Sequence, residues 1–301
     1  MKRRWAIWIA VGAMAISLTP GCAADSTDGA DDGTQGDDAE VIARDPNAMP
    51  KPMLTFLNQE GWGKHHLEWH TVRQWDLLSS DDQAYAKRQH WARADVQEGT
   101  KGNGLEFLAM HRVMIQMLTD KFPAYKDLFV GFAQPPTDCA DKLDPCGPEM
   151  PGPFDANKAK AIDKLQNHLA DFKTDDELGL YLETSLRPTA DKPDARGTDK
   201  SAGIHNYLHG RFMDSHSKID VGDPMVNLQN KKFWRIHGWI ENRWTAFRAL
   251  KKMSDSDPAY RAAIKKATDM FTITMKGPIG DPAQNEPPPM SLRKSFFKEP
   301  L

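Results

Sequence analysis

The chain has 301 residues, of which 40% are hydrophobic and 27% are charged, and its formal net charge is -3. This hydrophobic share is enough for a substantial buried core in one large or two ordinary domains. The small net charge, without a run of Lys and Arg interleaved with aromatic residues, argues against nucleic acid as a partner.

The N-terminus has the pattern of an export signal. Residues 2–4 are Lys-Arg-Arg, and the apolar stretch 5–18 that follows is too short for a permanent membrane span. We therefore interpret residues 1–22 as a signal peptide. Leu-Thr-Pro-Gly before Cys22 resembles a bacterial lipoprotein cleavage site, in which Cys22 would carry the lipid. The alternative is an ordinary secretory signal, so we expect a secreted or cell-envelope protein whose only membrane contact is this anchor.

The ends of the mature chain are predicted to flank one folded domain. Residues 23–46 are rich in Asp, Gly, Thr and Ala, which favours a disordered acidic tether. Pro46, Pro50 and Pro52 indicate an extended approach to a domain that covers residues 47–280. The segment 281–301 is rich in proline and is expected to lie on the surface without regular structure.

Helical periodicity is frequent within the domain and strand-like alternation is scarce, so the predicted fold class is mainly α with long irregular connections. The predicted helices are about 65–78, 81–97, 103–121 and 155–172, one that starts with the capping box at 174–177, one through 205 that ends near 214, one through 237 to about 253, and a shorter one from 257.

The longest connection, about 122–154, is rich in proline and contains Cys139 and Cys146. In an exported protein two such cysteines favour a disulfide bond. Free thiols or a metal-binding role are the alternatives, and the absence of a neighbouring histidine weakens the latter.

A first group of histidines indicates a metal site. His205 and His209 are four residues apart and therefore lie on one face of a helix. His237, in an aromatic-rich helix, could supply a third imidazole. Three imidazoles without a cysteine or a nearby carboxylate suit copper or zinc better than calcium or magnesium.

A second group repeats this arrangement. His66 and His70 are again four residues apart, and His111 lies on the apolar stripe of its own helix. For His111 the alternative is an ordinary core histidine, and His65 and His90 could replace ligands of this group. We expect tryptophans to line the site, with Trp69, Trp234 and Trp244 as candidates.

Both groups resemble the type 3 copper proteins, the family of tyrosinases, catechol oxidases and hemocyanins. His205-Asn-Tyr-Leu-His209 matches the motif HNxxH, and Phe233-Trp-Arg-Ile-His237 with the later Ile-Glu-Asn-Arg-Trp resembles FWxxH followed by IDRxW. Phe-Leu-Ala-Met-His111-Arg resembles FLxWHR. His65-His66-Leu-Glu-Trp-His70 is similar to the HHxxWH element of arthropod hemocyanins and phenoloxidases. The resemblance covers about residues 62–248.

This resemblance implies a helical bundle whose core holds two copper ions in a binuclear site. The implied ligands are His66, His70 and His111 for one ion, and His205, His209 and His237 for the other. The implied partners are dioxygen and a phenolic small molecule, with o-diphenols oxidised to quinones and monophenols hydroxylated at the ortho position. The alternatives are a dioxygen-binding protein without turnover and a single three-histidine metal site.

The residue after the first ligand of the HNxxH motif bears on the monophenol reaction. Asn206 occupies the position that in tyrosinases helps a glutamate hold a water, a proposed base for the phenol proton. That glutamate is expected nine residues before His205, where this chain has Arg196. Diphenol oxidation is therefore the firmer expectation, and Asn206 could instead have a packing or capping role.

Overall fold

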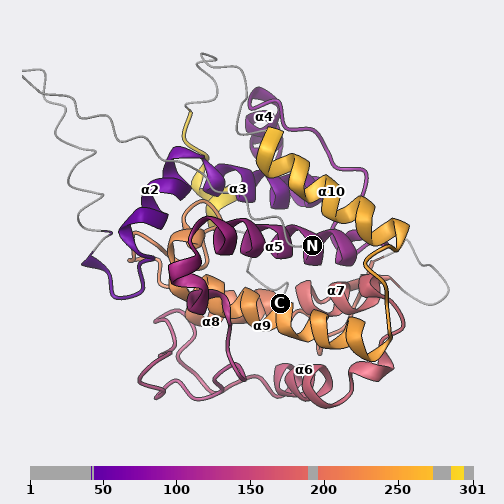
Figure 1. The fold of residues 1–301 in the computed structure, drawn as a ribbon. Helices are drawn as coiled ribbons and strands as arrows, with labels where there is room; N and C mark the ends of the chain where they lie inside the picture. Colours follow the sequence, from indigo (N-terminus) through magenta and orange to yellow (C-terminus); the bar gives the residue numbers. More distant parts are fainter. Residues whose placement is uncertain (1–41, 43, 189–195, 274–285, 295–301) are drawn as a thin grey trace, which may run out of the picture.

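The structure, a computed structural model, describes residue 42 and residues 44–188, 196–273 and 286–294. It is mainly helical, as predicted (Figure 1). The predicted signal peptide, Cys22 and most of the predicted tether lie outside the described residues. Within the described part of the chain, none of the helices has the length and apolar character needed to cross a membrane.

The helices are connected by short 3-10 turns and irregular segments. The α-helices are α2 (Lys51–Gln59), α3 (Trp62–Arg73), α4 (Ser80–Arg88), α5 (Asn103–Lys121), α6 (Ala156–Asn167), α7 (Asp175–Glu183), α8 (Ile204–Phe212), α9 (Lys231–Leu250), α10 (Pro258–Ile273) and α11 (Met290–Lys294). The 3-10 turns are η1 (Trp75–Leu77), η2 (Pro123–Phe129), η3 (Leu169–Asp171) and η4 (Asn227–Gln229). Two short strands, β1 (Leu186–Pro188) and β2 (Arg196–Thr198), pair antiparallel.

Helix α5 is the centre of the bundle. It contacts α7, α9 and α10, and Figure 1 shows it between α10 and α9. Its predicted apolar stripe is confirmed, since Phe107, Met114 and Leu118 are fully buried. Its close contact with α7 depends on two glycines: a Cβ on Gly104 would lie 2.1 Å from the carbonyl oxygen of Asp176, and one on Gly179 would lie 2.0 Å from that of Gly104.

The predicted capping box starts α7. The Thr174 hydroxyl accepts a hydrogen bond from the amide of Glu177 (3.1 Å), and the Glu177 carboxylate accepts one from the amide of Lys173 (2.9 Å). The first bond satisfies an amide that has no partner within the helix, and the second connects the residue before the cap to the first turn.

Helix α2 corrects the prediction of an extended approach to the domain. Pro52 lies in its first turn, where an amide hydrogen is not needed and the fixed φ of proline suits the helix. Met53 and Leu57 bury the inner face of α2.

The predicted helix 81–97 is also shorter in the structure, because it ends in a Schellman motif. His90 has a φ of 61°, its amide donates to the Lys87 carbonyl (3.1 Å), and the amide of Trp91 donates to the Ala86 carbonyl (2.9 Å).

The C-terminal segment was wrongly predicted to lack regular structure throughout. After a run of three prolines, Met290–Lys294 form α11, which packs on α3. The Leu292 side chain is fully buried in a small cluster with Leu67, Tyr85 and Trp91. Five residues are too few for a periodic apolar pattern, so the sequence does not indicate this helix.

The predicted disulfide between Cys139 and Cys146 is confirmed, with an S–S distance of 2.12 Å. It lies in the long connection, which packs over α8 and α9. The amide of Gly147 donates to the carbonyl of Arg211 (2.9 Å), and Lys232 Nζ donates to the carbonyl of Pro145 (2.7 Å). A disulfide of this kind fits an oxidising, exported environment.

Replacing both cysteines with serine is expected to lower the free energy of unfolding by about 2 kcal/mol, because the bond closes a short ring and restricts the unfolded chain. Urea unfolding of the metal-free protein measures this loss. The metal content of the variant is expected to stay that of the wild type, since neither cysteine touches any of the six histidines that the sequence predicts as metal ligands. Equal unfolding midpoints would contradict the prediction.

Candidate metal centre

Four helices bring the predicted ligands to one place in the core. His66 and His70 lie one turn apart on α3, and His111 lies on α5. His205 and His209 lie one turn apart on α8, and His237 lies on α9. All of these imidazoles are between 0 and 3% exposed. We call these six residues the histidine cluster.

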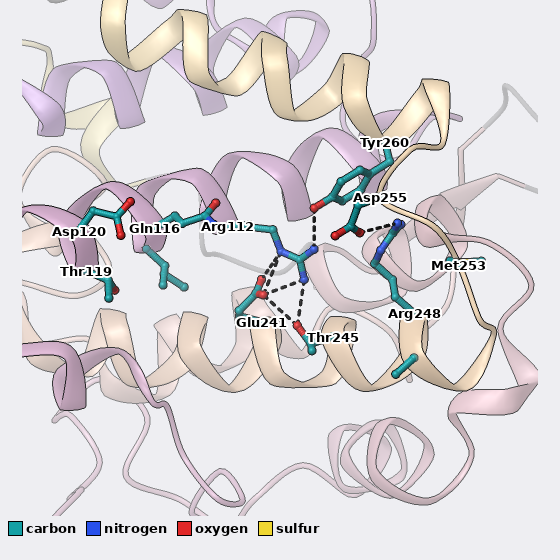
Figure 2. A pocket seen from close by; sticks show the side chains of 12 residues that line it. Arg112, Gln116, Thr119, Asp120, Glu241, Thr245, Arg248, Met253, Asp255 and Tyr260 are labelled. Atoms are coloured by element: carbon teal, nitrogen blue, oxygen red, sulfur yellow. Dashed lines mark hydrogen bonds and ion pairs between the residues drawn. The ribbon is translucent and has the colours of Figure 1, made fainter. Parts of the chain in front are cut away.

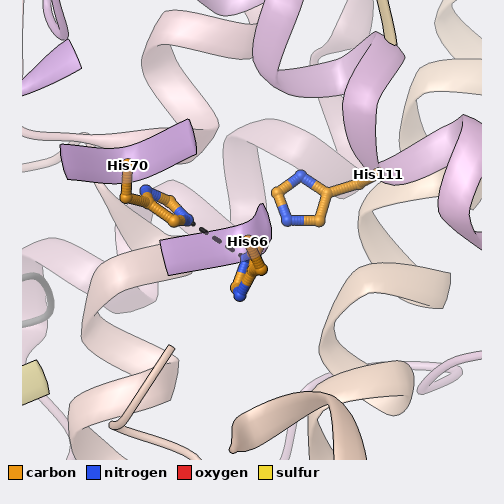
Figure 3. Close-up of side chains that lie close together, drawn as sticks. All are labelled: His66, His70 and His111. Carbon is orange, nitrogen blue, oxygen red and sulfur yellow. Dashed lines mark hydrogen bonds between the residues drawn. The ribbon is translucent and has the colours of Figure 1, made fainter. Parts of the chain in front are cut away.

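The ring nitrogens of the first group of predicted ligands lie close together. Figure 3 shows His66, His70 and His111 pointing toward one another, and one ring nitrogen from each lies within 4.8 Å of the others. The Nε2 atoms of His66 and His70 are 3.2 Å apart. Two nitrogens bound to one metal at about 2.0–2.1 Å in tetrahedral geometry would be about 3.3 Å apart. The spacing therefore matches that of two ligands of a single ion.

The second group contains a histidine of the first. The ring nitrogens of His111, His205 and His237 also lie within 4.8 Å of one another, and the Nε2 atoms of His205 and His237 are 3.1 Å apart. The rings of His111 and His237 are stacked with centroids 4.0 Å apart. His209 lies beside this group, with ring centroids 4.6 Å from His205 and 5.2 Å from His237.

Main-chain carbonyls fix which nitrogen of each ring faces the cluster. The Nδ1 atoms of His66, His111 and His237 lie 3.1, 3.0 and 2.8 Å from the carbonyl oxygens of Pro224, Phe107 and Phe233. His209 Nδ1 is 2.7 Å from that of Val221. Because a carbonyl only accepts, each Nδ1 carries the hydrogen and each Nε2 presents a lone pair, which is the usual arrangement of metal-binding histidines.

These lone pairs make a cation the natural occupant. His205 Nδ1 faces the side-chain oxygen of Asn206 at 2.9 Å, so its Nε2 is unprotonated like that of His237. Two unprotonated nitrogens 3.1 Å apart repel each other unless a positive ion lies between them. In addition, His111 Nε2 is buried without a hydrogen-bond partner among the described residues. The donor set therefore fits a metal.

Burial keeps the imidazoles neutral. It lowers the pKa of His66 to about 4 and lowers the pKa of the other five well below their usual value. For His70 the neighbouring imidazoles add to the effect, because a second positive charge in the cluster is unfavourable. Neutral imidazole is the form that binds a metal, so the cluster is ready for binding at neutral pH.

Aromatic rings enclose the cluster, but only one of the three predicted tryptophans is among them. Trp69 lies with its ring centroid 4.8 Å from that of His70. Trp234 instead donates its indole hydrogen to the Leu228 carbonyl, and Trp244 packs under Arg112. Two phenylalanines complete the lining: Phe233 stacks on His237 at 3.9 Å, and Phe107 is 4.7 Å from His111.

The two substitute ligands are elsewhere. His65 Nδ1 faces the Glu68 carboxylate at 3.8 Å, and His90 follows the end of α4. Neither belongs to a group of close ligand atoms in the described ranges.

The arginine after His111 supports the cluster from outside. Figure 2 shows Arg112 in a surface pocket of about 630 Å³, where its guanidinium pairs with Glu241 (2.7 Å) and donates to Tyr260 and Thr245. It also lies 3.6 Å above the ring of Trp244. The motif residues Arg112, Glu241 and Trp244 thus connect α5 to α9, the helices of His111 and His237.

A carboxylate beside Asn206 was missed by the sequence interpretation. The Asn206 side chain bonds to His205 on one side and to the carboxylate of Glu98 on the other. Glu98 is 4% exposed, also accepts a hydrogen bond from Gln74, and has its pKa raised by burial. It comes from the segment between α4 and α5, so spacing before His205 could not indicate it.

A second buried carboxylate lies close by. Glu183, at the end of α7, is 1% exposed and accepts a hydrogen bond from Asn103. Burial and then the negative charge of Glu98 raise its pKa well above the usual value. Its main-chain carbonyl accepts a hydrogen bond from His205, which further fixes the orientation of that imidazole.

No family model matches the chain, and no curated protein matches it. The resemblance to type 3 copper proteins therefore depends on the motif residues and on the geometry that they form.

Proposed function

We propose that the protein is an exported binuclear copper oxidase that uses dioxygen to oxidise o-diphenols to quinones. The observation that carries the proposal is the convergence of six neutral, buried imidazoles in the core. Five of them form two groups of close ring nitrogens that share His111, and His209 lies beside the second group. An all-imidazole donor set suits copper and zinc, and the resemblance of the motifs favours copper. When bound, a copper pair would supply dioxygen binding and the electrons exchanged with the phenol.

The protein's own contribution is orientation and exclusion of water. The carbonyls of Pro224, Phe107 and Phe233 hold the ring hydrogens and aim the Nε2 lone pairs inward. Phe107, Phe233 and Trp69 remove water from the surroundings of the imidazoles. A dry pocket of this kind protects a reactive centre from side reactions.

Copper loading followed by assay tests the proposal. The protein is expected to bind two copper ions per chain and to consume oxygen when an o-diphenol is added, with quinone formation followed by its visible absorption. Binding of a single ion, or two bound ions without oxygen uptake, would refute the oxidase function.

The burial of the histidine cluster favours a second candidate function, reversible dioxygen binding without turnover. All six imidazoles are at most 3% exposed, which admits dioxygen more readily than a phenol. The same loaded protein decides between the two: oxygen that is taken up and released under vacuum, with no diphenol oxidised, would assign the carrier function.

Glu98, held by Asn206, is a candidate proton acceptor for monophenols. Asn206 holds the Glu98 carboxylate beside His205, and a carboxylate whose pKa is raised by burial is a better base than an exposed one. We therefore extend the proposal to ortho-hydroxylation of monophenols, with Glu98 as the base.

Glu98→Gln is expected to lower monophenol hydroxylation by about 100-fold while diphenol oxidation stays within about twofold. The monophenol must lose its proton to a base before it is hydroxylated, whereas the two protons of a diphenol are taken up when dioxygen is reduced to water. Initial rates on both substrates at equal copper content measure the effect. Glu60→Gln, an exposed glutamate after α2, is the control and should change neither rate. Equal losses on both substrates would show that Glu98 acts only through structure.

A further inference from the structure

The C-terminal residues 286–294, which we call the strap, lie against the helix of the first ligand group. Figure 1 shows α11 beside α3, and the two helices are in contact. Leu292 is fully buried in the cluster that contains Leu67, the residue after His66. The strap is therefore part of the packing around α3 although it is remote in sequence.

Polar contacts attach the strap at both ends. Glu286 pairs with Arg88 (2.9 Å), and its carbonyl accepts a hydrogen bond from the Tyr85 hydroxyl (3.1 Å). Ser291 donates to the carboxylate of Asp82. All three contacts are made with residues of α4, so they fix the strap over one face of the bundle.

A separate contact connects the strap to the turn that holds His66. Arg293 donates from Nε (2.8 Å) to one carboxylate oxygen of Asp223, whose side chain is only 8% exposed, and its Nη2 forms an ion pair with the same oxygen (2.6 Å). The other oxygen accepts from the amide of Met225 (2.9 Å), and the Asp223 carbonyl accepts from the amide of Asn227 (2.8 Å). Asp223 thus organises the turn 223–227.

The next residue of that turn contacts the ligand itself. The carbonyl of Pro224 accepts the Nδ1 hydrogen of His66 at 3.1 Å. Without its carbonyl partner the His66 ring can rotate, which turns its Nε2 lone pair away from His70 and His111, or change tautomer, which places the hydrogen on Nε2. Arg293, Asp223 and Pro224 therefore form a continuous series of contacts from the strap to one ligand.

We propose that the strap positions His66 for metal binding, and that Arg293 is the positioning residue through which it acts. The inference rests on the metal centre of the proposed function but not on the oxidation of phenols. Because coupling between two binding events is reciprocal, a metal at His66, His70 and His111 must in turn hold the strap more tightly against the bundle.

Arg293→Gln in the full chain tests the proposal. Titration with copper(I) against a chromophoric chelator is expected to show one of two ions bound about 10-fold more weakly and the other unchanged, as is usual when the partner of a metal ligand is lost. Arg93→Gln removes an exposed Arg–Asp pair outside the strap and should leave both affinities at the wild-type value. Wild-type affinity for both ions in Arg293→Gln would overturn the proposal.

Hydrogen exchange supplies a readout that does not involve metal affinity. In the wild type, metal is expected to slow exchange at the amide of Leu292, which donates to the Pro289 carbonyl at 3.1 Å. In Arg293→Gln the slowing should be lost. If metal does not change the exchange rate of the Leu292 amide in the wild type, the coupling between strap and metal is also overturned. A wild type that binds two ions and shows the coupling, but oxidises no diphenol, would refute the proposed function while supporting the strap.

The route through Asp223 is tested by a double variant. If Arg293 acts only through this carboxylate, the double variant Asp223→Asn/Arg293→Gln should lower the affinity for the affected ion no more than Asp223→Asn alone. Additive losses would show that Arg293 acts independently of Asp223 and would overturn the route from the strap to His66. Near-UV circular dichroism confirms that each variant is folded before the titration.

Discussion

Replacing His111 with alanine is expected to weaken the binding of both copper ions. The copper content after dialysis against a mild chelator should then fall from two ions per chain to less than one. His111 belongs to both groups of close ligand atoms, and its ring is stacked on His237 at 4.0 Å. Loss of a residue that only orients a metal ligand typically lowers metal affinity by about 10- to 100-fold, and loss of the ligand itself should lower it further. Copper analysis of the dialysed protein measures the effect.

Two further variants make this result specific. His70→Ala should release only one ion, because His70 belongs to the first group alone. His168→Gln should release none, since this side chain is 56% exposed and lies outside the core. If His111→Ala retained one ion at the wild-type affinity, His111 would serve only the first group, as the sequence motifs imply.

The pairing of the candidate metal ligands could be predicted because its main determinant is local. A spacing of four residues places two imidazoles on one helical face whatever the rest of the chain does, and this applies to both pairs. Which imidazoles share an ion is a different question. It depends on how closely α5 approaches α8 and α9, and the sequence carries no measure of that distance. His111 is therefore found between the two groups rather than in the first alone.

Glu98 shows the same limit for residues around the site. The resemblance to tyrosinases predicts a glutamate nine residues before His205, where this chain has Arg196. The structure supplies the carboxylate from a segment near α5, through tertiary contacts with Asn206 and Gln74. Helix α11 is a similar case, because its burial depends on a small cluster formed by α3 and α4. Contacts between distant segments leave no periodic pattern in the sequence.

The metal-free protein is expected to lose stability steeply as the pH falls from about 6.5 to about 4. The unfolded histidine titrates near 6.5, while burial lowers the pKa of folded His66 to about 4. Between these values the unfolded chain binds more protons, so stability is full above this window and decreases as the pH falls through it. For His66 alone the loss is about 3 kcal/mol by pH 4.

The pKa values of the other five imidazoles are lowered in the same direction, so their protonation adds to the loss of stability as the pH falls. Glu98 and Glu183 act in the opposite sense, since their raised pKa values favour the folded state as the pH falls. Two carboxylates only partly offset six histidines. We therefore expect the acid-unfolding midpoint of the metal-free protein to lie within this window.

Urea unfolding of the metal-free protein at pH 7, 6 and 5 checks the prediction. His66→Gln should flatten the dependence because it removes one proton-binding group from the unfolded state. His216→Gln should not change it, since that side chain is 88% exposed. A stability that stays constant from pH 7 to 5 would contradict the buried neutral cluster. With copper bound, stability should persist to the pH at which protons displace the ions and then fall more sharply, because metal loss and protonation act on the same nitrogens.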